Sequence, residues 1–171
     1  MPTPALPDLL TDALVVAVDD SKPAREALRF ARQLAAGLGR PLAVVSVWNY
    51  VNSPQPAGSK DTAPSEAAWQ AEAEGRLAAL LAEEAPEPDD EEPAEQPVGQ
   101  EPVELQPVVL HGNTTPVLLE VSRRAAHLVI GSRGRGGFAG MLLGSTSDSM
   151  VRHAACPVTV VRTPATVGST G

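Results

Sequence analysis

A glycine-rich segment followed by small hydroxyl residues is the part of this 171-residue sequence best suited to chemistry. Gly131, Gly134 and Gly144 leave the backbone free to approach a ligand closely. Ser145 and Thr146 come next, at the expected start of a helix, where unpaired N–H groups and the helix dipole attract anions. An apolar strand, a glycine-rich loop and a helix N-terminus together predict a phosphate-binding site.

Two other glycine-rich phosphate loops fit the segment less well. A Walker A loop requires a lysine directly after its last glycine, but Ser145 occupies that position. A dinucleotide-binding turn follows the first strand of its domain, whereas this loop follows the expected fourth strand and little chain remains after it. Neither loop class therefore explains the segment, and these residues by themselves leave the identity of the phosphate compound open.

The spacing of the loop also resembles a known signature. The pattern Gly131-x2-Gly134-x9-Gly144-Ser145 is similar to the nucleotide-binding signature of the universal stress protein family, in its ATP-binding branch. Three further segments resemble the same family: VVAVDDS from residue 15, AVVSVW from residue 43 and HAACPVTVVR from residue 153. The resemblance covers roughly residues 13–162. It implies an α/β fold of the adenine nucleotide alpha hydrolase type, with an open five-stranded parallel sheet, helices on both faces and strand order 3-2-1-4-5.

The resemblance also implies which residues contact the cofactor, ATP. Amides and hydroxyls of the loop and the helix start would hold the ribose and phosphates, namely Gly131, Gly134, Gly144, Ser145 and Thr146. The adenine-side wall and the remainder of the predicted set are Ala17, Val18, Asp19, Val47, Ile130 and Arg133. Any Mg²⁺ would be held mainly by the phosphates. The sequence predicts no catalytic residue and no protein ligand for a metal.

Two of these assignments have a structural alternative. Asp19 follows a strand, where an aspartate often caps the next helix, although Asp20 and Ser21 are nearer to that position. Arg133 would neutralise phosphate charge. A solvated arginine in a loop explains its position equally well.

Apolar and helical patterns alternate along the chain. Predicted strands cover residues 13–18, 42–48, 103–110, 128–131 and 158–162, and predicted helices cover 22–38, 66–84, 115–125 and 145–153. This alternation predicts a parallel sheet with helices on both faces. Pro107 lacks an N–H group and so favours an edge position for the third strand. With the family's strand order, Asp19 and Gly131 end neighbouring strands and face one crevice.

The domain organisation follows from the distribution of charge and proline. The net charge is −8, but ten of the twenty-one acidic residues lie between Glu83 and Glu104, where there is no Lys or Arg. Such a segment buries too little apolar surface to offset its ordering entropy. We expect a single domain over residues 11–163 with a disordered acidic insert at about 85–102. Disordered tails are expected over residues 1–10 and 164–171.

Composition excludes several classes of protein. The apolar runs are shorter than the ~20 residues of a membrane helix, and no basic residue precedes Lys22, so a signal peptide is not expected. A basic patch for nucleic acid is missing. Cys156 is the single cysteine, which indicates a reducing, cytoplasmic environment and a small buried side chain.

The functional hypothesis is an ATP-binding stress-response sensor or adaptor. Its partners would be ATP, an unknown protein, and a second copy of the chain, joined as a homodimer through the last strand, Val158–Arg162. The family resemblance and the exposure of an edge strand both suggest this dimer. The alternative function is a slow ATPase or phosphotransferase that uses the same site. A third interpretation, an adaptor without nucleotide affinity, fits the intact glycine spacing poorly.

Overall fold

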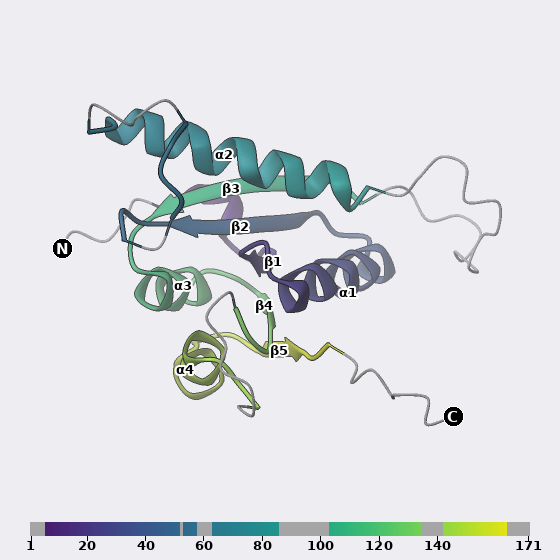
Figure 1. The fold of residues 1–171 in the computed structure, drawn as a ribbon. Helices are drawn as coiled ribbons and strands as arrows, with labels where there is room; N and C mark the ends of the chain where they lie inside the picture. Colours follow the sequence, from purple (N-terminus) through teal and green to yellow (C-terminus); the bar gives the residue numbers. More distant parts are fainter. Residues whose placement is uncertain (1–5, 52, 58–62, 86–102, 135–141, 164–171) are drawn as a thin grey trace, which may run out of the picture.

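The chain folds into an open α/β sheet (Figure 1). A computed structural model describes residues 6–51, 53–57, 63–85, 103–134 and 142–163 of the chain. All five strands pair in parallel in the order β3-β2-β1-β4-β5. The strands are β1 Leu14–Val18, β2 Leu42–Trp48, β3 Leu105–His111, β4 His127–Gly131 and β5 Val158–Val161. The helices are α1 Lys22–Leu38, α2 Glu66–Glu83, α3 Thr114–Ser122 and α4 Ser145–His153. The predicted fold class and strand order are confirmed.

The sheet separates two apolar cores. Helices α1 and α2 pack on one face, where Val16 of β1 is fully buried, and α1 lies mainly over β1 and β4 while α2 lies over β3 and β2. Helices α3 and α4 pack on the other face, where Val15 is equally buried. Successive residues of a strand point to opposite faces, so a strand that is covered on both sides must be apolar throughout. This explains the uninterrupted apolar sequence of β1.

Helix α1 begins and ends where its sequence predicts. The Ser21 hydroxyl accepts a hydrogen bond from the Ala24 N–H at 3.3 Å and caps the helix. Gly39 ends it in the left-handed conformation, at φ 60°. Its buried residues recur at helical spacing and face β1 and β4: Ala24, Ala27, Leu28, Ala31 and Ala35.

Strands β3 and β5 form the two edges of the sheet. Strand β3 pairs only with β2, so Pro107 sits in an edge strand as predicted. Strand β5 is the opposite edge, and each of its four residues is half-buried.

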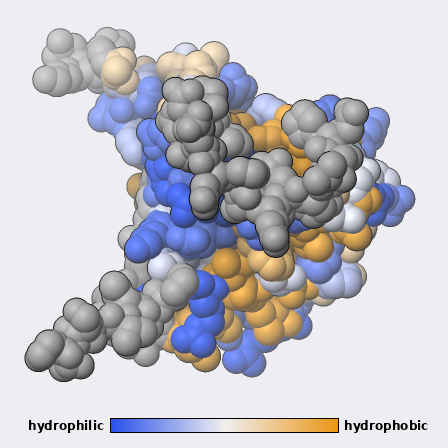
Figure 2. Space-filling model, turned by 90° about the vertical axis from the view of Figure 1, so that its right-hand side faces the viewer, coloured by the Kyte–Doolittle hydropathy of each residue, from blue (hydrophilic) through white to orange (hydrophobic). Residues whose placement is uncertain are grey.

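Figure 2 shows the side of the molecule on which α1, α2 and β5 end, with an apolar area in the lower half of the view. Exposed apolar side chains of α1 include Phe30 and Leu38, which are 40% and 56% exposed.

The prediction of a tail over residues 1–10 is wrong for its last part. Asp8–Leu10 form a 3-10 helix, and the Leu10 side chain is completely buried against the α3 and α4 core. The Arg124 guanidinium also donates a hydrogen bond to the Leu6 carbonyl at 3.2 Å. Leu6, Leu9 and Leu10 span too few residues to give a periodic signal. The predicted insert beyond Ala85 and the C-terminal tail lie outside the described residues. Among the described helices, none is long and apolar enough to cross a membrane.

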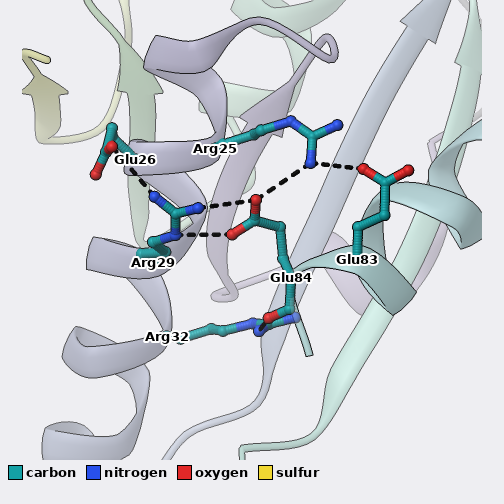
Figure 3. Close-up of polar contacts among 6 residues, drawn as sticks. All are labelled: Arg25, Glu26, Arg29, Arg32, Glu83 and Glu84. Atoms are coloured by element: carbon teal, nitrogen blue, oxygen red, sulfur yellow. Dashed lines mark hydrogen bonds and ion pairs between the residues drawn. The ribbon is translucent and has the colours of Figure 1, made fainter. Parts of the chain in front are cut away.

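Three arginines of α1 hold the C-terminal end of α2 (Figure 3). The Glu84 carboxylate, only 6% exposed, receives hydrogen bonds from the Arg29 guanidinium at 2.7 and 3.0 Å. Arg25 contacts the same carboxylate at 3.2 Å and Glu83 at 2.8 Å, and Arg32 donates to the Glu84 carbonyl. These acceptors raise the pKa of Arg25, whereas burial lowers the pKa of Arg32. The cluster ties α2 to α1 immediately before the acidic segment.

We expect Glu84→Gln to destabilise the fold more than Glu83→Gln. The glutamine would leave partly buried guanidinium groups without their charged acceptor, which should lower the free energy of unfolding by about 1–2 kcal/mol. Glu83 is 61% exposed, so the same change there should cost less than about 0.5 kcal/mol. Urea denaturation of both variants measures the difference. Equal midpoints would show that the cluster does not stabilise the attachment of α2.

Candidate functional site

An open cleft of about 1040 Å³ lies at the carboxyl ends of the central strands. Its floor comes from β1, β2 and β4, and its walls come from the first turn of α1, from α3 and from α4. Parallel sheets bind ligands where the strand order reverses, here between β1 and β4. The structure brings all eleven predicted site residues to this cleft: Ala17, Val18, Asp19, Val47, Ile130, Gly131, Arg133, Gly134, Gly144, Ser145 and Thr146.

Asp19 is held in a fixed position at the end of β1. Its Oδ1 atom accepts hydrogen bonds from the Ser21 N–H at 3.2 Å and from the Ser21 hydroxyl at 2.5 Å. Its Oδ2 atom lies against Gly134, where an added Cβ would come within 2.6 Å. The helix cap itself is Ser21, so Asp19 orients the capping residue. A role at the start of α1 and a role at the cleft are thus compatible for Asp19, because Oδ1 contacts Ser21 while Oδ2 reaches the glycine loop.

Gly131 and Gly144 are glycines for different reasons. A Cβ on Gly131 would lie 2.7 Å from the Pro23 carbonyl carbon and 2.9 Å from the Ala24 nitrogen, so this glycine lets α1 approach β4. A Cβ on Gly144 would meet only ordinary contacts, the nearest at 3.4 Å from the Arg133 Cα. Gly144 also has extended dihedral angles, φ −79° and ψ 167°, that any residue adopts. The fold requires a glycine at 131 but does not require one at 144.

The two ends of the glycine loop are joined at its base. The Ser132 carbonyl accepts hydrogen bonds from the Gly144 N–H at 2.8 Å and from the Ser147 hydroxyl at 2.7 Å. The Ser132 N–H donates to the Val161 carbonyl of β5 at 2.7 Å. These bonds place the N-terminus of α4 at the end of β4. Residues 135–141, which include the remaining loop glycines, lie outside the described residues.

A second helix N-terminus faces the same cleft. Thr114, the first residue of α3, lines it, and the hydroxyls of Thr115 and Thr146 lie 3.3 Å apart. The first N–H groups of both helices lack intrahelical acceptors and carry the positive ends of the helix dipoles. Two such N-termini make this part of the cleft favourable for an anion.

The charged side chains that line the cleft are of both signs. Asp19 and Asp148 are the acidic groups among the described lining residues, and Arg133 is the basic group. The Arg152 guanidinium donates to the Asp148 carboxylate at 2.9 Å and lowers the pKa of that aspartate. Within the described part of the chain, no acidic side chain pairs with Arg133. Among the described lining residues, Arg133 is therefore the group whose positive charge could meet an anion.

Sequence reasoning missed several lining residues. Asn49 follows β2 in the way that Asp19 follows β1, so the rule that strand ends meet at one edge could have identified it. Thr114 follows β3 at a helix start and carried the same signal. Ser147 belongs to the same hydroxyl-rich helix start as Ser145 and Thr146, which indicated it. Nothing in the sequence indicated the others: Ala24, Val45, Ser53, Leu118, Leu142, Leu143 and Asp148.

The side chains most often used as catalysts have other contacts. His111 stacks on Trp48 with ring centroids 4.2 Å apart, and the His127 ring is 2.9 Å from the Thr159 hydroxyl. Cys156 is half-buried against the apolar core, and burial raises the pKa of its thiol. Among the described residues, no group of His, Cys, Asp or Glu could hold a metal ion.

Sequence comparison identifies one family over most of the chain. The model of the universal stress protein family matches residues 11–162. A universal stress protein of Mycobacterium bovis is 55% identical over 53 residues, which are 31% of this chain and 17% of that relative. The chain thus covers only a small part of the length of the curated relatives that it matches.

Solved structures share the fold. The universal stress protein UspA from Lactobacillus plantarum superimposes with a TM-score of 0.60 at 19% identity, over 89% of this chain and 99% of that one. A universal stress protein family protein from Arabidopsis thaliana, solved with AMP bound, gives a TM-score of 0.51 at 18% identity, over 90% of this chain and 93% of that one.

The two glycines offer a direct test of the geometry. Gly131→Ser should lower the free energy of unfolding by about 1–3 kcal/mol, because its Cβ would meet backbone atoms that cannot move aside cheaply. Gly144→Ser should change it by less than about 0.5 kcal/mol, since serine is a preferred residue at a helix N-cap. Thermal or urea denaturation measures both variants. If Gly144→Ser is the more damaging, the packing described for Gly131 is wrong.

Proposed function

We propose that this chain, which belongs to the universal stress protein family, binds ATP in the cleft between β1 and β4 and acts as a nucleotide-dependent sensor or adaptor. The observation that carries the proposal is the convergence of strand ends, loop glycines and helix N-termini on one cleft. A structural relative from Arabidopsis thaliana was solved with AMP bound, which supports an adenine nucleotide as the ligand class.

The phosphates would lie at the glycine loop. Among the described loop glycines, Gly144 is the one where the protein's own packing leaves room for a side chain, so its glycine is best explained by a close approach of the ligand. The N–H groups of Ser145 and Thr146 would donate to phosphate oxygens. Arg133 would supply the positive charge. Mg²⁺, where it accompanies ATP, would be held mainly by the phosphates.

The adenine would lie beside the ends of β1 and β2. Ala17, Val18 and Val47 offer an apolar wall there, and such walls provide most of the contact area in nucleotide pockets. Asp19 supplies the polar acceptor at the edge of this wall, with its carboxylate oriented by Ser21. Base and phosphates would thus occupy the two sides of the β1–β4 crevice.

Binding is favoured over rapid turnover. The described lining residues include neither histidine nor cysteine, so the hydroxyls of Ser145 and Thr146 lack an imidazole base. Slow ATP hydrolysis or phosphotransfer at the same cleft is the second function that we retain. We place the sensor in the cytoplasm, with a downstream protein partner.

We also propose a homodimer through the last strand and Arg162, over residues 158–162. Strand β5 is a sheet edge with half-buried valines, and an uncovered edge invites pairing with another chain. A two-fold contact between identical edges would cover both at once. Helix α1 lies beside β5 and carries the exposed Phe30, which would extend the apolar surface.

The nucleotide site is tested by Gly144→Val. The valine side chain would occupy the space that the phosphates approach, and ATP affinity should fall at least about tenfold, or ~1.4 kcal/mol, by calorimetry. The matched control is Gly37→Val, because Gly37 lies in α1 with open space around it. Native mass spectrometry of the wild type with ATP separates binding from hydrolysis, because bound ATP indicates binding and the appearance of ADP indicates hydrolysis. Equal ATP affinity of Gly144→Val and wild type would contradict the placement of the phosphates.

Sedimentation velocity tests the dimer. At micromolar concentration, with or without ATP, the chain should sediment as a dimer because the β5 edge is then paired. A single monomeric species under both conditions would rule out the proposed contact.

A further inference from the structure

The turn between β1 and α1 contains a residue in an unfavourable backbone conformation. Asp20 has φ 59°, in the left-handed region that residues other than glycine seldom adopt. The turn reverses the chain between the buried Val18 and the capping residue Ser21. A residue in this region persists where surrounding contacts hold it, and such sites cluster at functional positions.

Arg76 of α2 makes one of these contacts. Its guanidinium pairs with the Asp20 carboxylate, and the two side chains are 27% and 34% exposed. Both residues line a narrow gap between α2 and the end of β2, which adjoins the large cleft because Val18, Val47 and Ser53 line both. The pair therefore joins the β1–α1 turn to a helix that is 56 positions away in sequence.

Helix α2 is a firm base for this contact. Trp69 stacks on Trp48 of β2 with ring centroids 6.2 Å apart, and the Trp48 indole N–H donates to Gln70 at 2.7 Å. Leu77, next to Arg76, is almost fully buried, at 3% exposure. At the far end of α2, Glu84 is held by the arginines of α1 (Figure 3). Arg76 is thus presented from a helix that is also held by its contacts with β2 and with α1.

The neighbouring aspartates point in opposite directions. Asp20 faces α2, whereas Asp19 lines the cleft and accepts hydrogen bonds from the Ser21 N–H and hydroxyl. If Asp20 left its left-handed conformation, Ser21 would move relative to Asp19 because the three residues share one tight turn. We infer that Arg76 is a positioning residue: it holds Asp20 in the turn that fixes Asp19 and Ser21 for the ligand. This inference rests on the proposed nucleotide site.

A purely structural role for the pair predicts a different result. If the pair only attached α2, its loss would lower the thermal midpoint and leave the turn and the cleft unchanged. A positioning role requires that the Arg76 side chain alters both the order of the turn and nucleotide affinity. It also requires that Arg76→Lys, which keeps a cation, restores part of the effect.

The experiment uses the full chain and AMP as the probe. Arg76→Gln should weaken AMP binding about threefold to fivefold, the range expected for a partly exposed ion pair. Arg76→Lys should lose less, because it keeps a cation beside the Asp20 carboxylate. Arg123→Gln is the matched control, because Arg123 pairs with Glu120 on the exposed face of α3.

Amide hydrogen exchange of residues 19–24 without nucleotide is the second measurement. Exchange there should be faster in Arg76→Gln than in wild type or Arg123→Gln. Unchanged exchange in Arg76→Gln overturns the inference whatever the ligand does, and so does unchanged AMP affinity in a wild type that binds AMP. A wild type that binds neither AMP nor ATP overturns the proposed nucleotide site instead, and the exchange result then decides by itself whether Arg76 holds the turn.

Discussion

The close approach of α1 to β4 is the contact on which the rest of the site depends. It requires that residue 131 have no side chain, because Pro23 and Ala24 occupy the position of its Cβ. Once α1 begins this close to β4, Ser21 and Asp19 face the glycine loop across a short gap. The loop then returns through the Gly144 N–H to the Ser132 carbonyl and starts α4 beside them. A single packing constraint thus brings two segments, more than a hundred residues apart in sequence, to the same cleft.

Most of the fold could be predicted because its local signals agree. The apolar strands, the Ser21 cap and the Gly39 stop each have a physical cause within a few residues. The structure has the cap and the stop where the sequence places them, and the strands within two residues of their predicted bounds. The strand order was predicted correctly as well, but from the family resemblance, because no local sequence pattern contains it. The short 3-10 helix over Asp8–Leu10 was missed because one buried leucine has no periodicity to detect.

The candidate site was predictable where chemistry and topology coincide. The glycines and hydroxyls at the end of β4 and the start of α4 were identified because their types fit a phosphate, whereas the residues at the ends of β1 and β2 were assigned through the family resemblance. Side chains such as Leu118 and Val45 reach the cleft only through packing, which the sequence does not show. Arg76 is a stronger example, because an arginine in the middle of an amphipathic helix normally indicates a solvated face, yet this one pairs with Asp20 in the β1–α1 turn.

The central claim is that the N-terminus of α4 and the loop before it bind an adenine nucleotide. Titration of ATP into isotope-labelled protein, followed by amide resonances, tests this claim most directly. The account predicts saturable shifts of Gly131, Gly134, Ser145 and Thr146 together with Asp19, while exposed residues of α2 remain unchanged. Saturable shifts confined to another surface, or no shifts at millimolar ATP, would contradict it.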